Sequence, residues 1–210
     1  MHKLFTLPAV VNGMKNLLSL SFLLCLLSPA IAQDEAIAAF ERAQKKIDKT
    51  GMLVLGGWSV ANIVTGAVGT NSDDRETKYF SQMNLTWNAF NLLIAAAGYY
   101  AASKDRKSDL TLQEVVRHQN KKEKIFLLNA GLDVAYITGG LYLTERSRRN
   151  EDPAKLKGFG NAIMLQGAFL LLFDVVMYSL HRRGGKAFEN LTGNLTLLAS
   201  PAGLAVAYRF

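Results

Sequence analysis

Residues 125–144 read IFLLNAGLDVAYITGGLYLT, a run in which Asp133 is the only charged side chain. A helix of about 20 apolar residues spans the hydrocarbon core of a membrane. Three further runs of similar composition occupy about 51–70, 84–103 and 158–181. We therefore predict an all-α membrane protein, in which four transmembrane helices form two tandem helical hairpins within residues 51–181.

The charged residues gather between these runs. Half of the 210 residues are apolar and 20% are charged. A charge at the centre of a bilayer costs roughly 3 kcal/mol, so this segregation is typical of membrane proteins. The alternative is a soluble bundle with a very apolar core, but soluble helices have a polar face that these runs lack.

The excess of basic over acidic residues indicates that the chain has a lipid bilayer as its partner. The formal net charge is +7, and the lysine and arginine residues flank the apolar runs, where anionic headgroups lie. No basic stripe alternates with stacking aromatic residues, so we predict no nucleic-acid partner.

The sequence predicts no cofactor, no metal site and no catalytic residues. The single cysteine, Cys25, precedes the predicted cleavage site, and His118 and His181 lie in different segments as a poor metal pair. We expect these histidines in loops or at the interface. There is no phosphate-binding glycine loop and no nucleophile elbow, so we predict that the protein is not an enzyme.

Residues 1–32 have the pattern of a signal peptide. A short basic region at Met14-Lys15-Asn16 precedes an apolar stretch from Leu17 to Leu27, and small residues at 28–32 suit cleavage before Gln33. The pattern fits a start at Met14 better than one at Met1. An uncleaved signal anchor is the alternative.

The segments on either side of the apolar domain have their own patterns. Residues 33–50 are predicted to form an amphipathic helix on the membrane surface, since apolar residues recur there at helical spacing. In the tail, 182–210, alternating residues predict a short β-hairpin with a turn at Pro201-Ala202-Gly203. A lone hairpin cannot cross a membrane. A terminal aromatic strand also fits an outer-membrane protein, which is an alternative location.

The two hairpins resemble each other in sequence. A shift of 74 residues matches Leu53 with Leu127, Gly57 with Gly131 and Gly66 with Gly140, and a shift of 79 matches Lys78 with Lys157, Phe90 with Phe169 and Tyr99 with Tyr178. These matches predict an internal repeat, and transporter sites often lie at such a repeat interface.

Each apolar run has one polar stripe, and we expect the four stripes to face one another rather than lipid. The candidate intramembrane cluster consists of Asn62, Asn88, Asn91, Asn129, Asp133, Tyr136, Asp174 and Tyr178. At 1.5 Å per residue, Asp133 lies about 12 Å and Asp174 about 10 Å from the same side of the membrane. The two carboxyl groups are therefore predicted to meet at similar depth.

Two neighbouring carboxylates in a low dielectric do not both ionise easily, so we expect the pair to hold one proton. The functional interpretation is a proton or cation relay, or an oxygen-rich cation site. The structural interpretation is that the aspartates and asparagines only join the helices by hydrogen bonds. Both interpretations remain open at this point, and catalysis is the weakest of the three.

Three polar motifs resemble a known family. They are Tyr79 to Asn84 with Trp87, Asn88 and Asn91; Asn129 to Asp133 with Tyr136; and Leu165 to Phe169 with Asp174. Together they resemble a family of uncharacterised small four-helix membrane proteins of the Bacteroidota, classed as a domain of unknown function. The resemblance covers roughly residues 50–210 and implies a bacterial envelope location with no known activity.

The topology signals conflict. A cleaved leader puts Gln33 outside, yet the segments then outside carry more basic residues than the cytoplasmic ones, against the positive-inside rule. We expect the leader to prevail, with a reversed topology as alternative. The predicted protein is an inner-membrane component of the bacterial envelope that is structural or binds a partner, either another envelope protein or a second copy. The alternative is a small proton- or cation-coupled carrier that uses Asp133 and Asp174.

Overall fold

The computed structural model describes residues 8–104, 110–193, 195–200 and 203–208, and side-chain surroundings for the described residues within 34–190. The chain divides into two compact units, Met1–Ala39 and Phe40–Phe210. The first unit is helical from Pro8 onward. All packing described below lies within the second unit.

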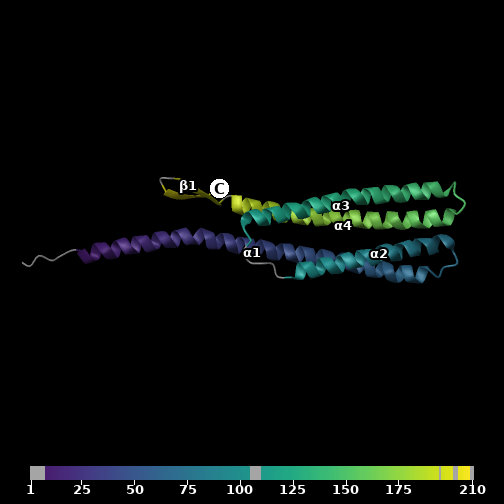
Figure 1. Ribbon diagram of the computed structural model, residues 1–210, viewed down its shortest axis with the longest axis horizontal. Helices are drawn as coiled ribbons and strands as arrows, with labels where there is room; N and C mark the ends of the chain where they lie inside the picture. The colour runs from purple at the N-terminus through teal and green to yellow at the C-terminus, as the bar shows by residue number, and fades with distance from the viewer. Residues whose placement is uncertain (1–7, 105–109, 194, 201–202, 209–210) are drawn as a thin grey trace, which may run out of the picture. The chain divides into compact units, whose positions relative to one another are not determined.

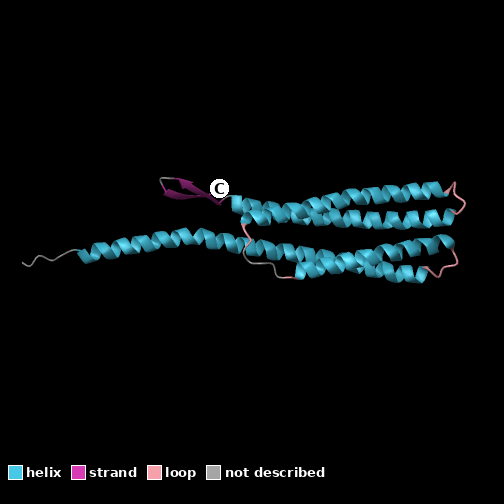
Figure 2. Ribbon diagram, in the orientation of Figure 1, coloured by secondary structure: helices cyan, strands magenta, loops and turns pink. Residues whose placement is uncertain are grey.

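Four helices, the first of which begins in the first unit, form the bundle of the second unit (Figures 1 and 2). They are α1 (Pro8–Gly69), α2 (Arg75–Ser103), α3 (Leu112–Ser147) and α4 (Pro153–Gly193). From Phe40 on, α1 forms an antiparallel hairpin with α2, and α3 forms another with α4. Contacts between α3 and α4 hold the second hairpin together, and contacts between α2 and α4 place the two hairpins side by side.

Local signals in the sequence fix the helix starts. Asp74 caps α2, because its carboxylate accepts the Thr77 backbone N–H at 2.9 Å, and hydrogen bonds from Thr77 hold the pKa of Asp74 below its usual value. Thr111 and Glu114 form a reciprocal capping box at the start of α3. Pro153 is the first residue of α4. Proline is tolerated at this position because the backbone N–H that it lacks would make no hydrogen bond within the helix.

The turns of the two hairpins lie at the same end of the bundle and are joined by ion pairs. Arg75 Nη2 lies 2.7 Å from Asp152 Oδ2, and Lys157 Nζ lies 2.8 Å from Glu76 Oε2. Exposed pairs contribute little to stability. Their value here is that they bring the start of α2 to the start of α4.

Glycines let α3 and α4 approach closely. A Cβ atom on Gly140 would lie 2.6 Å from the Gly160 carbonyl oxygen, and one on Gly160 would lie 2.6 Å from the Gly140 carbonyl oxygen. Small residues at helix contacts allow this spacing in membrane proteins. By contrast, a Cβ on Gly139 would meet nothing within 4 Å.

The second unit is polar inside and apolar outside. Its most buried side chains include Asn84, Asn88, Gln166 and His181, whereas Leu93, Val68 and Leu128 are each more than 60% exposed. This arrangement is the reverse of a soluble bundle, in which apolar residues fill the core. Within the described part of the chain, three helical segments are long and apolar enough to cross a membrane: Asp34–Gly69, Leu112–Ser147 and Pro153–Asn190.

The predicted span 84–103 is not among these three segments. It lies in α2, where Asn84, Asn88 and Asn91 lower the mean hydropathy. The all-α fold with four helices agrees with the prediction, but a fourth membrane span is not supported by composition.

Several predicted boundaries were wrong. Residues 33–50 and 51–70 belong to one continuous helix, because no proline separates them and Gly51 accommodates the Met177 side chain. The helices also extend past the apolar runs, since backbone hydrogen bonding does not require apolar side chains. Residues 182–193, predicted as tail, continue α4.

The end of the chain forms two short strands. β1 (Leu195–Ser200) pairs antiparallel with β2 (Gly203–Tyr208), with Leu195 opposite Tyr208. The predicted turn residues Pro201-Ala202 and the terminal residues 209–210 lie outside the described residues. So do residues 1–7 at the start of the predicted leader.

The α3–α4 glycine contact predicts opposite outcomes for two neighbouring glycines. We expect Gly140→Leu to destabilise the protein by about 1–3 kcal/mol, since the added side chain must push α4 away. The melting temperature should fall by about 2–12 °C. Gly139→Leu is the matched control, because its Cβ faces open space. Circular dichroism in detergent measures both, and equal melting temperatures for the two variants would contradict the packing.

Candidate functional site

A chain of buried side-chain amides joins three helices near the middle of the bundle. Gln166 of α4 is fully buried, and its Oε1 accepts the Trp58 indole N–H of α1 at 2.9 Å. Its Nε2 donates to Asn84 Oδ1 of α2. Asn84 Nδ2 in turn donates to Asn62 Oδ1 at 3.0 Å. Each hydrogen bond links a different pair of helices, so this amide network fixes the relative rotation of α1, α2 and α4.

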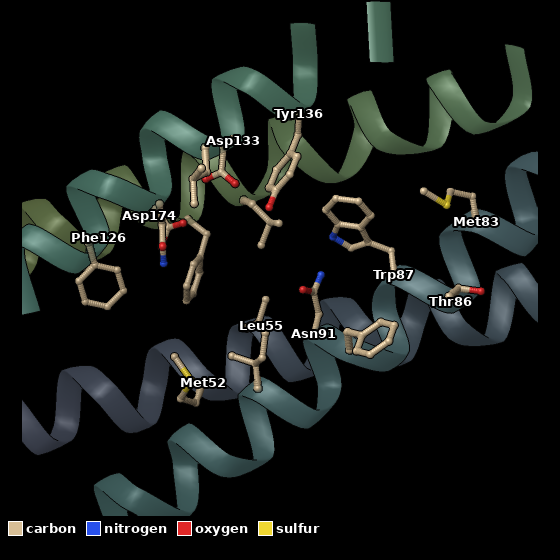
Figure 3. Close-up of a pocket in the computed structure, with 16 residues that line it drawn as sticks. Met52, Leu55, Met83, Thr86, Trp87, Asn91, Phe126, Asp133, Tyr136 and Asp174 are labelled. Carbon is tan, nitrogen blue, oxygen red and sulfur yellow. The ribbon is translucent and has the colours of Figure 1, made fainter. Parts of the chain in front are cut away.

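A pocket of about 550 Å³ lies next to this network, between the two hairpins (Figure 3). Asp133, Asp174 and Tyr136 reach it from α3 and α4, and Trp87 and Asn91 reach it from α2. The rest of the lining is mostly apolar or aromatic: Met52, Leu55, Met83, Thr86, Phe90, Ile94, Phe126, Asn129, Leu132, Leu170 and Phe173. A largely apolar wall with a few polar groups is typical of a ligand site.

The pocket is open on the side between α2 and α3. Phe90 and Ile94 of α2 line it yet stay 64% and 58% exposed, and Leu132 of α3 stays 46% exposed. These side chains face the same surroundings as the apolar exterior of the bundle. A ligand can therefore enter sideways, from the lipid if the bundle lies in a membrane.

Two carboxyl groups lie together on one wall. The side chains of Asp133 and Asp174 interact directly with each other, and Asp174 also interacts with the Asn129 amide. Both aspartates are at most 5% exposed. Among the described residues that line the pocket, none is lysine, arginine or histidine. The pair therefore has no positive partner in the pocket wall.

Two polar atoms at the pocket lack hydrogen-bond partners. One is Oδ2 of Asp133, which is 2% exposed, and the other is Nδ2 of Asn91, which is 6% exposed. Leaving a buried polar atom unpaired costs about 1–3 kcal/mol, so such atoms need an explanation. Because one is an acceptor and the other a donor, a single ligand with both functions would satisfy them.

Aromatic rings frame the opening. The Trp87 and Tyr136 rings meet edge to face across the α2–α3 side, with centroids 5.0 Å apart and an interplanar angle of 87°. Phe126 and Phe173 line the inner wall. Aromatic faces attract organic cations as well as apolar groups.

The predicted cluster is divided between the pocket and the amide network. Asn91, Asn129, Asp133, Tyr136 and Asp174 line the pocket. Asn62 and Asn88 lie in or beside the amide network, where Asn88 Nδ2 donates to the Asn84 carbonyl at 2.8 Å. Tyr178 does not line the pocket, and it interacts electrostatically with Arg182.

Sequence reasoning missed Trp87, Phe126 and Phe173 as pocket residues and Gln166 as the centre of the network. The aromatic residues look like ordinary membrane-facing residues in a sequence. Gln166 could have been identified from the sequence, because it is an uncharged polar residue in the middle of an apolar run. An unpaired amide is costly there, so its side chain needs a hydrogen-bond partner on another helix.

A second polar cluster surrounds His181, which is buried rather than interfacial as predicted. Its Nδ1 contacts Gln44 Oε1, and its Nε2 lies 3.0 Å from Asp48 Oδ1. Asp48 pairs with Lys122 at 2.6 Å. The sequence feature that could have indicated this cluster is the spacing of Gln44 and Asp48, which are four residues apart and therefore lie on one helix face.

Charges in this second cluster are balanced. Arg182 Nη1 lies 3.0 Å from Glu123 Oε2, and the Gln119 amide donates to the His181 carbonyl at 2.6 Å. The cluster joins α1, α3 and α4 at the end opposite the turns. Among the described residues, no group of three or more His, Cys, Asp or Glu side chains stands in a position to hold a metal ion.

The comparison with protein families matches residues 54–175 to a family of unknown function (DUF6992). The match covers more than half of the chain, so the chain belongs to this family. It includes the amide network and all pocket residues except Met52. No curated protein and no solved structure matches the chain. The resemblance to a family of unknown function is thereby confirmed, and its restriction to the Bacteroidota stays a prediction.

Replacing the central amide tests the network. Gln166→Leu leaves Trp58 Nε1 without its acceptor and Asn84 Oδ1 with only the Asn88 amide as donor, so we expect a loss of about 1–3 kcal/mol in the free energy of unfolding. Gln82→Leu, at a half-buried glutamine of α2 outside the network, is the control. Thermal unfolding in detergent measures both. A Gln166→Leu protein as stable as the control would mean that the network does not hold the hairpins together.

Proposed function

We propose that this chain is a small integral membrane protein that binds a lipophilic small molecule in the pocket between its two hairpins, without catalysing a reaction. The observation that best supports this is the pair of unpartnered polar atoms, Asp133 Oδ2 and Asn91 Nδ2, on opposite walls of a largely apolar pocket. A protein without a ligand for this site would leave both atoms unsatisfied at a cost to stability.

Membrane insertion is supported by the direction in which side chains point. The exterior of the second unit is rich in large apolar residues, and three helices are long and apolar enough to cross a bilayer. We propose that α2 crosses as well. Its asparagines are buried against the other helices, so the face that it offers to lipid consists of residues such as Phe90, Leu93 and Ile94.

The proposed location is the inner membrane of a bacterial envelope, with the outer membrane as the alternative. The leader pattern at residues 1–32 supports export, with Gln33 outside after cleavage. The matched residues of the two hairpins support an internal repeat, whose halves would face each other across the pocket. In a bacterial envelope the bilayer supplies the lipophilic partner, and a second protein or copy is a further proposed partner.

A proton- or cation-coupled carrier is the second candidate. Two interacting carboxyl groups within candidate membrane spans favour it, because such groups are costly in a bilayer and frequently mark proton or ion paths. The carrier and the binding protein share one site and differ in whether the ligand leaves on the other side.

Ligand occupancy of the pocket is the first test. We expect tritiated 1-decanol, a neutral lipophilic probe, to bind saturably to the protein in phosphatidylcholine nanodiscs after subtraction of empty nanodiscs. Leu132→Trp should abolish this binding, since the larger side chain projects into the pocket from its rim. Val134→Trp, on the same helix and 52% exposed but outside the lining, should bind like wild type. Equal loss in both variants, or no saturable binding at all, would refute the proposal.

Transport is tested separately. For a carrier, the internal pH of liposomes that contain the protein should fall when the outside is acidified, or change when a cation gradient is imposed. Asp133→Asn should reduce this proton flux at least tenfold. Asp152→Asn, which removes an exposed carboxylate at the turn end, serves as the control. A pH-sensitive dye trapped inside the vesicles reports the flux. If the internal pH of vesicles with wild-type protein changes no faster than that of protein-free vesicles between pH 5 and 8, this candidate is excluded.

A further inference from the structure

We propose that the ligand of this pocket is a lipophilic amine, which binds through its single positive charge to Asp133 and Asp174. The inference rests on the proposed function, because it names the chemical class of the molecule held there. It depends on three features of the pocket: its charge, its unpaired atoms and its aromatic walls.

The pocket carries a negative charge that a cation would neutralise. Two carboxyl groups in contact share one proton, since two full negative charges at such short distance repel strongly in a low dielectric. The pair then has one net negative charge. No described lining residue is basic, and the nearby cations Lys122 and Arg182 are already paired with Asp48 and Glu123. Either a second proton or a monovalent cation from outside the protein neutralises this charge, and the unpaired atoms of the pocket favour the cation.

The unpaired atoms select an ammonium group. Apart from the proton shared with Asp174, Asp133 Oδ2 has no hydrogen-bond donor, and a primary ammonium has three N–H donors, enough for both carboxyl groups. On the facing wall, the Nδ2 of the 6% exposed Asn91 is a donor without an acceptor. It is an observation independent of the carboxyl pair, and it suits a hydroxyl or ether oxygen on the same ligand.

The rest of the wall selects a lipophilic body and disfavours an inorganic ion. Phe90, Leu132, Leu170 and Phe173 are further lining residues. Trp87 and Tyr136 present aromatic rings at the opening of the pocket (Figure 3). Alkali and alkaline-earth cations take six or more oxygen ligands. An alkylammonium instead places its charge at the carboxylates and its chain along the apolar wall.

A matched pair of probes tests the charge. We expect decylamine to bind the protein in phosphatidylcholine nanodiscs at pH 7 at least tenfold more tightly than 1-decanol, which has the same chain but no charge. The double variant Asp133→Asn/Asp174→Asn keeps the size of both side chains and removes the charge of the pair, whereas a single substitution leaves one carboxyl group that can still ionise. The double variant should lower decylamine affinity to that of decanol while decanol affinity stays unchanged. Asp152→Asn should leave both affinities as in wild type.

The outcomes separate the ligand class from the proposed function. Saturable decanol binding with no preference for decylamine overturns the amine proposal and leaves the pocket as a binding site. Absence of saturable binding for both probes overturns both. An equal loss of decylamine binding in Asp152→Asn would trace the preference to surface charge and also overturn it. If the double variant fails to bind decanol, the pocket itself has changed, and Asp133→Ser/Asp174→Ser then decides the question by the same criterion.

Discussion

The need to pair polar groups inside an apolar bundle determines most of this structure. The exterior is apolar, so every amide within the apolar runs has to find its partner on another helix or on its own backbone. Gln166 does this for two helices at once, since it accepts from Trp58 and donates to Asn84. Once these bonds form, the rotation of α1, α2 and α4 is fixed, and the positions of the other polar side chains follow.

The pocket lies where this pairing stops. Along α2, Asn84 is bonded on both sides, Asn88 donates to the α2 backbone although its Oδ1 has no partner, and Asn91 at the pocket has an unpaired N–H. The carboxyl pair of Asp133 and Asp174 lies across the pocket from it (Figure 3). The same polar stripe is thus structural at one end and open to a ligand at the other, which explains why a structural role and a binding role were both reasonable interpretations of the sequence.

Glycine contacts and charged clusters hold the bundle around this centre. Gly140 and Gly160 bring α3 and α4 together more closely than side chains allow, and the His181 cluster ties α1, α3 and α4 at one end. Because α2 and α3 each pack on α4, their own side of the bundle is left open. That gap in the packing, lined by Trp87 and Tyr136, gives the pocket its entrance.

The sequence alone determined the four helices, their pairing into hairpins and the inward direction of the polar stripes, because hydropathy and charge placement are local properties of the chain. It misplaced helix ends, since a helix continues through polar residues where nothing breaks it. Only the tertiary structure decided that Asn91 and Asp133 face a shared space, that Tyr178 does not, and that His181 is buried. These facts depend on how each helix is rotated against its neighbours, which is set by contacts between residues as far apart in the chain as Asn84 and Gln166.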